Sequence, residues 1–328
     1  MTLLTPSRIG AIKTLASRIL FMGTPDFATS VLSLLSRKGH EIVGVYTQPD
    51  RPSGRSKNPK PSDVKTYASK QGIPTFEPET LKSDQEALKN IETLKIDLVV
   101  VAAYGLYIPN SILEVPSLGC LNIHPSLLPL HRGPSPVATA LLNGDSITGV
   151  TIMQLTSEVD SGPIVAQKRV DIKPEESSYS LTRRLFELGG ELLVDILPSF
   201  QNGEIQLRQQ NHSEATFTEK LTRDHGNIDW HLGVNYLVRQ TRAYDPWPGS
   251  FSHWNGKLLK IIGASAYDIR SESLHQPGKV ISIDTTVGVQ TGNGILIPKT
   301  IHLEGKKRMN ATEFLNGHKN FIGSILGK

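Results

Sequence analysis

Short apolar runs alternate with amphipathic stretches along the first two thirds of the chain. The apolar runs predict strands at 19–22, 41–47, 97–103, 119–123, 149–155 and 164–170. Between them, apolar positions at helical spacing predict helices over 28–37, 61–70, 136–142 and 178–201. Residues 97–103 (DLVVVAA) are apolar almost throughout, as expected of a parallel strand that is buried on both faces. This alternation predicts an α/β fold with an open, doubly wound, mostly parallel sheet.

The pattern changes after residue 203. Residues 204–224 are polar with few periodic apolar positions, which predicts a linker. Short β-like runs then follow at 257–262, 278–283, 288–290 and 295–303. They predict a small, OB-like β-barrel. We therefore expect an α/β domain over 19–205, a linker over 206–224 and a β-barrel domain over 225–328.

Composition excludes several protein classes. The chain has 328 residues, of which 38% are hydrophobic and 20% charged, so it is not predominantly disordered. It has no run of about 18 apolar residues, the length that would predict a membrane-spanning helix, and we expect no membrane partner. Its single cysteine, Cys120, can form neither an internal disulfide nor a cysteine-cluster metal site. We therefore expect a reducing compartment and no metal.

The positive charge is concentrated in the C-terminal third. Residues 219–328 hold 14 Lys/Arg and 9 Asp/Glu, whereas residues 1–218 hold 21 and 22. A local basic cluster lies at Lys306, Lys307 and Arg308. Such a basic module is typical of a protein with a polyanionic partner, and a solvated basic face is the alternative explanation.

The first 18 residues differ from the rest. They are basic and rich in hydroxyl groups, their apolar residues can share one helical face, and no acidic residue precedes Asp26. This composition is typical of a mitochondrial transit peptide, and a short irregular terminus is the alternative.

Polar residues follow the predicted strands at the sheet edge where open α/β folds bind ligands. The segment 21–27 has one glycine instead of the three of the dinucleotide fingerprint, which argues against a nicotinamide cofactor. Asn122 and His124 are two apart at the end of a strand, so their side chains share one face and can donate hydrogen bonds to one oxygen. Asp160, in the loop after strand 149–155, is either a turn former or a partner that orients His124.

These residue types favour transfer without a covalent enzyme intermediate. Asn122 and His124 would stabilise an oxyanion formed when an amine attacks a carbonyl, and Asp160 with His124 would handle the proton. The nearby nucleophile candidates, Ser126 and Cys120, lie in no recognisable nucleophile motif.

From residue 19 to its C-terminus, the chain resembles the methionyl-tRNA formyltransferases, a family of folate-dependent enzymes. The matching segments are 21–27 (FMGTPDF), 47–55 (TQPDRPSGR), 103–109 (AYGLYIP), 122–129 (NIHPSLLP), 132–134 (RGP), 149–154 (GVTIMQ), 160–162 (DSG), 228–230 (IDW) and 242–249 (RAYDPWPG). The Asn-x-His and Leu-Leu-Pro segments are shared by folate-dependent formyltransferases in general. The Thr-Gln-Pro-Asp and Pro-Trp-Pro segments narrow the resemblance to the tRNA enzymes and close relatives.

The resemblance implies formyl transfer from 10-formyltetrahydrofolate to the methionine amino group of initiator methionyl-tRNA. We separately expect a monomer. It implies a catalytic trio of Asn122, His124 and Asp160. The residues that it assigns to folate binding are Ser126, Leu127, Leu128 and Pro129. In the loop 48–60 it assigns tRNA binding to Arg51, Arg55, Lys57 and Lys60. It also assigns tRNA binding to the C-terminal domain, where the basic cluster offers Lys306, Lys307 and Arg308 as candidates.

The sequence departs from many bacterial members at two places. The loop 54–60 has one basic residue fewer, which bears on how the tRNA acceptor stem is bound, and Pro125 replaces an alanine that is frequent there. Pro125 and the N-terminal segment together predict the mitochondrial matrix, with the bacterial cytoplasm as the alternative. For function, the alternatives are a family member that acts on another small amine or on water, and a non-catalytic nucleic-acid-binding protein.

Overall fold

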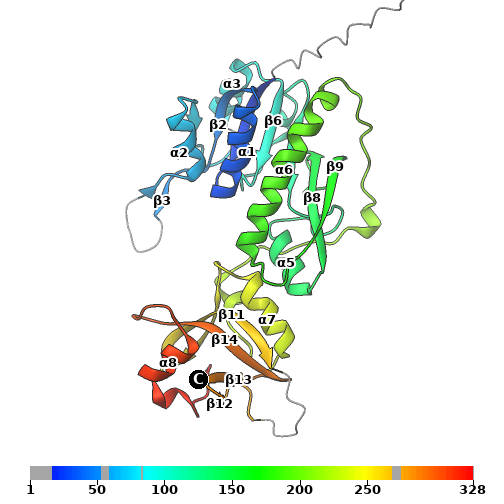
Figure 1. The fold of residues 1–328 in the computed structure, drawn as a ribbon. Coiled ribbons are helices and arrows are strands. Elements are labelled where there is room, and N and C mark those ends of the chain that lie inside the picture. The colour runs from blue at the N-terminus through cyan, green and yellow to red at the C-terminus, as the bar shows by residue number, and fades with distance from the viewer. Residues whose placement is uncertain (1–16, 53–58, 83, 268–274, 328) are drawn as a thin grey trace, which may run out of the picture. The chain divides into compact units, whose positions relative to one another are not determined.

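The computed structural model describes residues 17–52, 59–82, 84–267 and 275–327 (Figure 1). The predicted transit peptide lies almost wholly outside them. The strands are β1 (Arg18–Gly23), β2 (Glu41–Tyr46), β3 (Arg51–Pro52), β4 (Pro59–Lys60), β5 (Thr75–Phe76), β6 (Leu98–Ala102), β7 (Cys120–His124), β8 (Ile147–Gln154), β9 (Ile164–Asp171), β10 (Ser250–Trp254), β11 (Lys257–Tyr267), β12 (Val280–Ile283), β13 (Thr286–Gln290), β14 (Ile295–Leu303) and β15 (Met309–Asn310).

The α-helices of the described residues are α1 (Asp26–Arg37), α2 (Asp63–Lys70), α3 (Gln85–Thr93), α4 (Asn110–Leu113), α5 (Pro136–Asn143), α6 (Ser178–Gln201), α7 (Val234–Ala243) and α8 (Ala311–Gly317). Short 3-10 turns lie at His212–Glu214, Arg223–Gly226 and Lys319–Phe321. The predicted helix over 178–201 is confirmed to the residue, and the others agree with the predictions within a few residues at each end.

A seven-stranded sheet in the order β5-β2-β1-β6-β7-β8-β9 carries the α/β fold. The pairs β1–β2, β1–β6, β2–β5 and β6–β7 are parallel, and β8–β9 is antiparallel. Every residue of β6 is buried, because the apolar run LVVVA presents no polar side chain to either face. The predicted open, mostly parallel sheet is confirmed.

Packing divides the chain into two units, residues 1–122 with 190–206 and residues 123–189 with 207–328. In the second unit α5 contacts α7, and Val137 and Leu141 share a hydrophobic cluster with Ala243 and Tyr244. The division therefore runs through β7 and α6 instead of along the predicted linker. The predicted domain limits of 19–205 and 225–328 remain predictions.

A six-stranded antiparallel sheet, with strand order β10-β11-β14-β13-β12 and β15 against β14, forms the C-terminal part of the second unit. Its core includes Trp254, Leu259, Val289, Ile301 and Phe314. The antiparallel sheet agrees with the strands that were predicted for this domain. Closure of the sheet into an OB-like β-barrel stays a prediction, and α7, α8 and β10 are additions that the hydrophobic pattern does not predict.

Candidate active site

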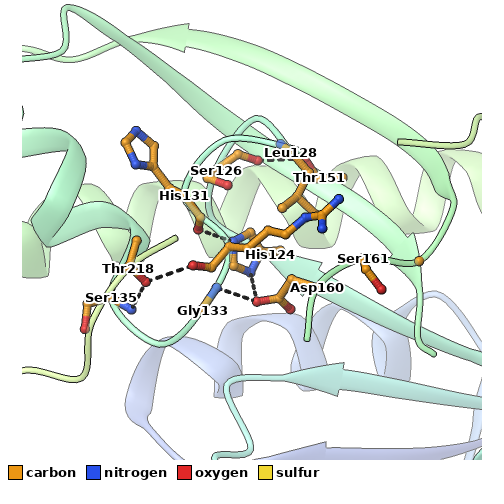
Figure 2. A network of polar contacts seen from close by, with 12 residues as sticks. His124, Ser126, Leu128, His131, Gly133, Ser135, Thr151, Asp160, Ser161 and Thr218 are labelled. Carbon is orange, nitrogen blue, oxygen red and sulfur yellow. Dashed lines mark hydrogen bonds and ion pairs between the residues drawn. The ribbon is translucent and has the colours of Figure 1, made fainter. Parts of the chain in front are cut away.

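His124 ends β7 with only 4% of its surface exposed. Its Nε2 lies 3.0 Å from the carbonyl oxygen of His131. A carbonyl oxygen can only accept a hydrogen bond, so Nε2 carries the proton and donates it to this bond. In the neutral ring Nδ1 is therefore unprotonated, and it lies 3.6 Å from Oδ2 of Asp160 (Figure 2). The structure thus brings the predicted imidazole and carboxylate together.

Asp160 lies in the loop between β8 and β9, and its side chain is 14% exposed. Its Oδ2 also accepts a hydrogen bond of 2.8 Å from the backbone N–H of Gly133. Its φ of 47° is in the left-handed region, which costs about 1 kcal/mol for a non-glycine residue. Asp160 is therefore held in a conformation that a free loop would seldom adopt, with its carboxylate directed at His124.

Asn122 lies two residues before His124 on β7, opposite Val101 of β6, and is half-buried. The alternation of side chains along a strand gives Asn122 and His124 the same face. This is the spacing that two donors need to reach one oxygen, so the third member of the predicted trio keeps its predicted position on the strand.

The four residues predicted to bind folate follow β7 directly. Ser126 and Leu128 are buried, whereas Leu127 and Pro129 are partly exposed. The Ser126 hydroxyl donates to the Leu130 carbonyl, and Leu128 packs in a small cluster with Met153 and Ile164. Ser126 and Leu128 therefore anchor the segment. Folate binding by all four residues stays a prediction.

Neither nucleophile candidate is suited to covalent catalysis. Burial raises the pKa of the Cys120 thiol to about 12, which removes the reactive thiolate at neutral pH. The Ser126 residue is fully buried, and its hydroxyl donates its proton to the Leu130 carbonyl oxygen, which is too weakly basic to activate it. The surroundings of both residues favour direct transfer.

The predicted tRNA contacts lie in both units. Arg51 and Lys60 are exposed and face each other across the β3–β4 ribbon. Arg55 and Lys57, between the two strands, are outside the described residues. In the other unit, Lys306, Lys307 and Arg308 are all exposed in the connection between β14 and β15, in keeping with a basic surface.

Sequence reasoning missed several residues that shape the site. The His131 carbonyl and the Gly133 N–H bind the His124–Asp160 pair directly. Arg132 and Gln210 are bonded to each other, and Gln210 is also bonded to the Asp160 backbone. Arg132 and Gly133 belong to a family motif, which gives a sequence signal. Gln210 lies in the predicted linker, where no local pattern marks it.

The described residues contain no group of three or more His, Cys, Asp or Glu side chains suited to holding a metal ion. Among the described helices, none combines the length and apolar character needed to cross a membrane.

Comparison with known proteins gives matches along nearly the whole chain. Residues 17–197 match the Formyl transferase family, and residues 220–319 match the family described as Formyl transferase, C-terminal domain. A methionyl-tRNA formyltransferase of Chloroflexus aggregans is 45% identical over 302 residues, which cover 92% of this chain and 97% of the relative. One from Roseiflexus castenholzii is 44% identical over 311 residues, covering 94% of this chain and 99% of the relative.

Solved structures share the fold at lower identity. HypX from Aquifex aeolicus, in complex with tetrahydrofolic acid, has a TM-score of 0.64 and 20% identity. The match covers 94% of this chain and 48% of HypX. The sugar 3N-formyl transferase WlaRD, with dTDP and 5-N-formyl-THF, also has a TM-score of 0.64, at 17% identity over 89% of this chain and all of WlaRD. The relatives compared by sequence are bacterial, so the comparisons do not support the predicted mitochondrial location.

Proposed function

This chain belongs to the formyl transferase family, and we propose that it transfers a formyl group from 10-formyltetrahydrofolate to the amino group of methionine on initiator methionyl-tRNA. The observation that carries the proposal is the buried His124–Asp160 pair at the end of β7, with Asn122 two residues earlier on the strand. The relatives named methionyl-tRNA formyltransferase, which align over almost their full length, support this acceptor.

The hydrogen bonds of His124 define its role in the proposed reaction. Nε2 is occupied by the His131 carbonyl, so Nδ1 is the nitrogen left for proton transfer or for the reacting oxygen. When Nδ1 is protonated, the Asp160 carboxylate stabilises the resulting imidazolium. His124 can then donate to the formyl oxygen together with the Asn122 amide as negative charge develops on that oxygen. The proton of the attacking amine passes to Asp160, directly or through water. The bond between the formyl carbon and N10 of the folate then breaks, and the same proton passes to N10, so that tetrahydrofolate leaves as the neutral amine.

An acceptor assay tests this function. Purified protein is mixed with 10-formyltetrahydrofolate and separately with methionine-charged initiator tRNA, methionine-charged elongator tRNA, free methionine or an amino sugar. We expect the formyl group on initiator methionyl-tRNA alone, measured by mass spectrometry of the released amino acid.

Other results of the acceptor assay would each support one of the alternative functions. A formylated small amine would indicate a different acceptor within the same family. Loss of the donor's formyl group with no acceptor present would indicate a hydrolase. Binding of tRNA without any loss of the formyl group would indicate a non-catalytic nucleic-acid-binding protein.

The location and assembly of the enzyme are tested separately. The bacterial relatives favour the bacterial cytoplasm over the mitochondrial matrix. We accordingly expect a reporter fused to residues 1–25 to stay in the cytosol of a eukaryotic cell, as followed by fluorescence microscopy. Import into mitochondria would instead restore the location predicted from the N-terminal composition. The predicted monomeric state is checked by light scattering of the purified chain.

A further inference from the structure

Gln210 binds the backbone of the loop that carries Asp160. Its Nε2 donates to the carbonyl oxygen of Asp160 at 2.8 Å and to that of Gly162 at 2.7 Å. The residue is only 5% exposed, so these bonds are shielded from competing water. One side chain therefore fixes two carbonyl groups of the β8–β9 loop.

Arg132 holds Gln210 in this orientation. Its Nε and Nη2 both donate to Oε1 of Gln210, at 3.1 and 2.7 Å, and the guanidinium also lies 3.3 Å from Nδ1 of His212. With its oxygen engaged by Arg132, the amide of Gln210 must direct its nitrogen at the loop carbonyls. Arg132 is 3% exposed, so its side chain has little freedom to move away.

The backbone closes these contacts into a ring. Gly133, the residue after Arg132, donates its N–H to the Asp160 carboxylate (Figure 2). Arg132 itself is paired through its backbone with Thr216 and Thr218, which follow Gln210 in the chain. Asp160 is thus held at its carboxylate by Gly133 and at its carbonyl by Gln210, and Arg132 connects the two.

The loop has little room to compensate if this ring opens. A Cβ atom at Gly162 would lie 1.9 Å from the Gln154 carbonyl oxygen, so the loop closes tightly on the end of β8. Asp160, whose φ is positive, lies between this tight contact at Gly162 and the exposed residues 157–159. The Gln210 contact lies where the backbone conformation most needs support.

We propose that Gln210, oriented by Arg132, is a positioning residue that sets the Asp160 carboxylate against His124, and that the predicted linker is in this way part of the active site. The inference deepens the proposed function and rests on it, since it takes Asp160 to act in formyl transfer. It concerns the geometry of the pair and assigns Gln210 no contact with substrate.

Gln210→Glu tests the two hydrogen bonds that the Gln210 amide donates, with almost no change in the shape of the side chain. The carboxylate still accepts from Arg132, but it has no N–H groups for the Asp160 and Gly162 carbonyls. We expect kcat to fall by about 10- to 100-fold, as for a small misplacement of a catalytic group, with KM for both substrates unchanged. Deuterium uptake of the peptide spanning residues 155–163 should rise in the same variant.

Gln210→Ala and Gln290→Ala form a matched pair that separates positioning from stability. Gln290 is also a buried glutamine whose Nε2 donates to two backbone carbonyls, those of Thr291 and Gly294, but it lies in the C-terminal sheet. Both changes should lower the thermal unfolding midpoint, and only Gln210→Ala should lower kcat and raise uptake in 155–163. Equal losses of kcat in the two variants, or an unchanged kcat in Gln210→Glu, would overturn the proposal.

The uptake measurement keeps this inference distinct from the proposed function. If the wild-type chain transfers no formyl group to methionyl-tRNA, the proposed function fails. Uptake in 155–163 then still decides whether Gln210 holds the loop: a rise in Gln210→Glu supports the positioning contact, and unchanged uptake overturns it.

Discussion

Replacement of Asp160 by asparagine is expected to lower kcat for formyl transfer by about 10²- to 10⁴-fold, the usual contribution of a group that handles a proton. Asparagine keeps the shape of the side chain and an oxygen that can accept from the Gly133 N–H. It carries no negative charge, so it neither stabilises a protonated His124 nor takes up the proton of the amine. Single-turnover kinetics of formyl transfer measure the effect on the chemical step.

KM for the formyl donor should change little in Asp160→Asn, because the side chain acts mainly in the transition state. Titration of a folate analogue followed by tryptophan fluorescence checks this directly. Turnover close to that of the wild type would remove Asp160 from the mechanism. A large loss of folate affinity would instead assign Asp160 to substrate binding.

Asp145→Asn is the matched control. Asp145 also pairs with a histidine, since its Oδ2 lies 2.8 Å from Nε2 of His131. The pair belongs to the same unit as His124 and Asp160, and the change removes the same charge. If loss of any carboxylate beside a histidine impaired the protein, both variants would lose activity to the same extent. We expect the large loss of kcat in Asp160→Asn alone.

The sheet of the α/β fold could be predicted because its strands are recognisable one at a time. The run LVVVA in β6 is short and rich in valine, which favours a strand buried on both faces. The helix predicted over 61–70 is α2, which begins at Asp63 because Ser62 accepts from the Lys65 N–H as a helix cap. Each of these features depends on neighbours within a few residues, which a single sequence displays.

The elements that were missed depend on partners far away in the chain. Helix α7 is largely polar, and its buried residues, such as Leu237 and Ala243, become recognisable only against β11 and α5. The strand β10 is short and carries serine and histidine between its aromatic residues. Its place in the sheet comes from pairing with β11, which no periodicity in β10 reveals.

The residues of the candidate site likewise include some that could be predicted from the sequence and others that could not. Asn122 and His124 could be proposed because strand alternation relates them directly. Asp160 was placed beside His124 only as a possibility, since 36 residues separate the two in sequence. Gln210 was missed because it reaches Asp160 across 50 positions from a segment without any periodic pattern. A segment whose polar sequence predicts a linker can therefore contribute a buried side chain to a site.

Replacing Lys306, Lys307 and Arg308 together by alanine is expected to flatten the salt dependence of tRNA binding. All three are exposed in the β14–β15 connection, where long cationic side chains can reach phosphates without desolvation of the core. If each contacts one phosphate, the slope of log K against log salt concentration falls by about 2 to 3. Between 50 and 200 mM salt the wild type should therefore lose about 20- to 40-fold more affinity than the variant.

Fluorescence anisotropy of labelled initiator tRNA over this salt range measures the slope. The control removes the same charge elsewhere, at three exposed basic residues at the C-terminal ends of α1 and α2 in the first unit, Arg37, Lys38 and Lys70. Because neutralising any three cations weakens long-range attraction, both variants should bind more slowly at low salt. The slope depends on the number of counterions that direct phosphate contacts release from the tRNA. It should therefore change only in the β14–β15 variant, which loses such contacts. Equal slopes in the two variants would show that the tRNA phosphates bind elsewhere. The exposed basic side chains of the β14–β15 connection would then form a solvated face.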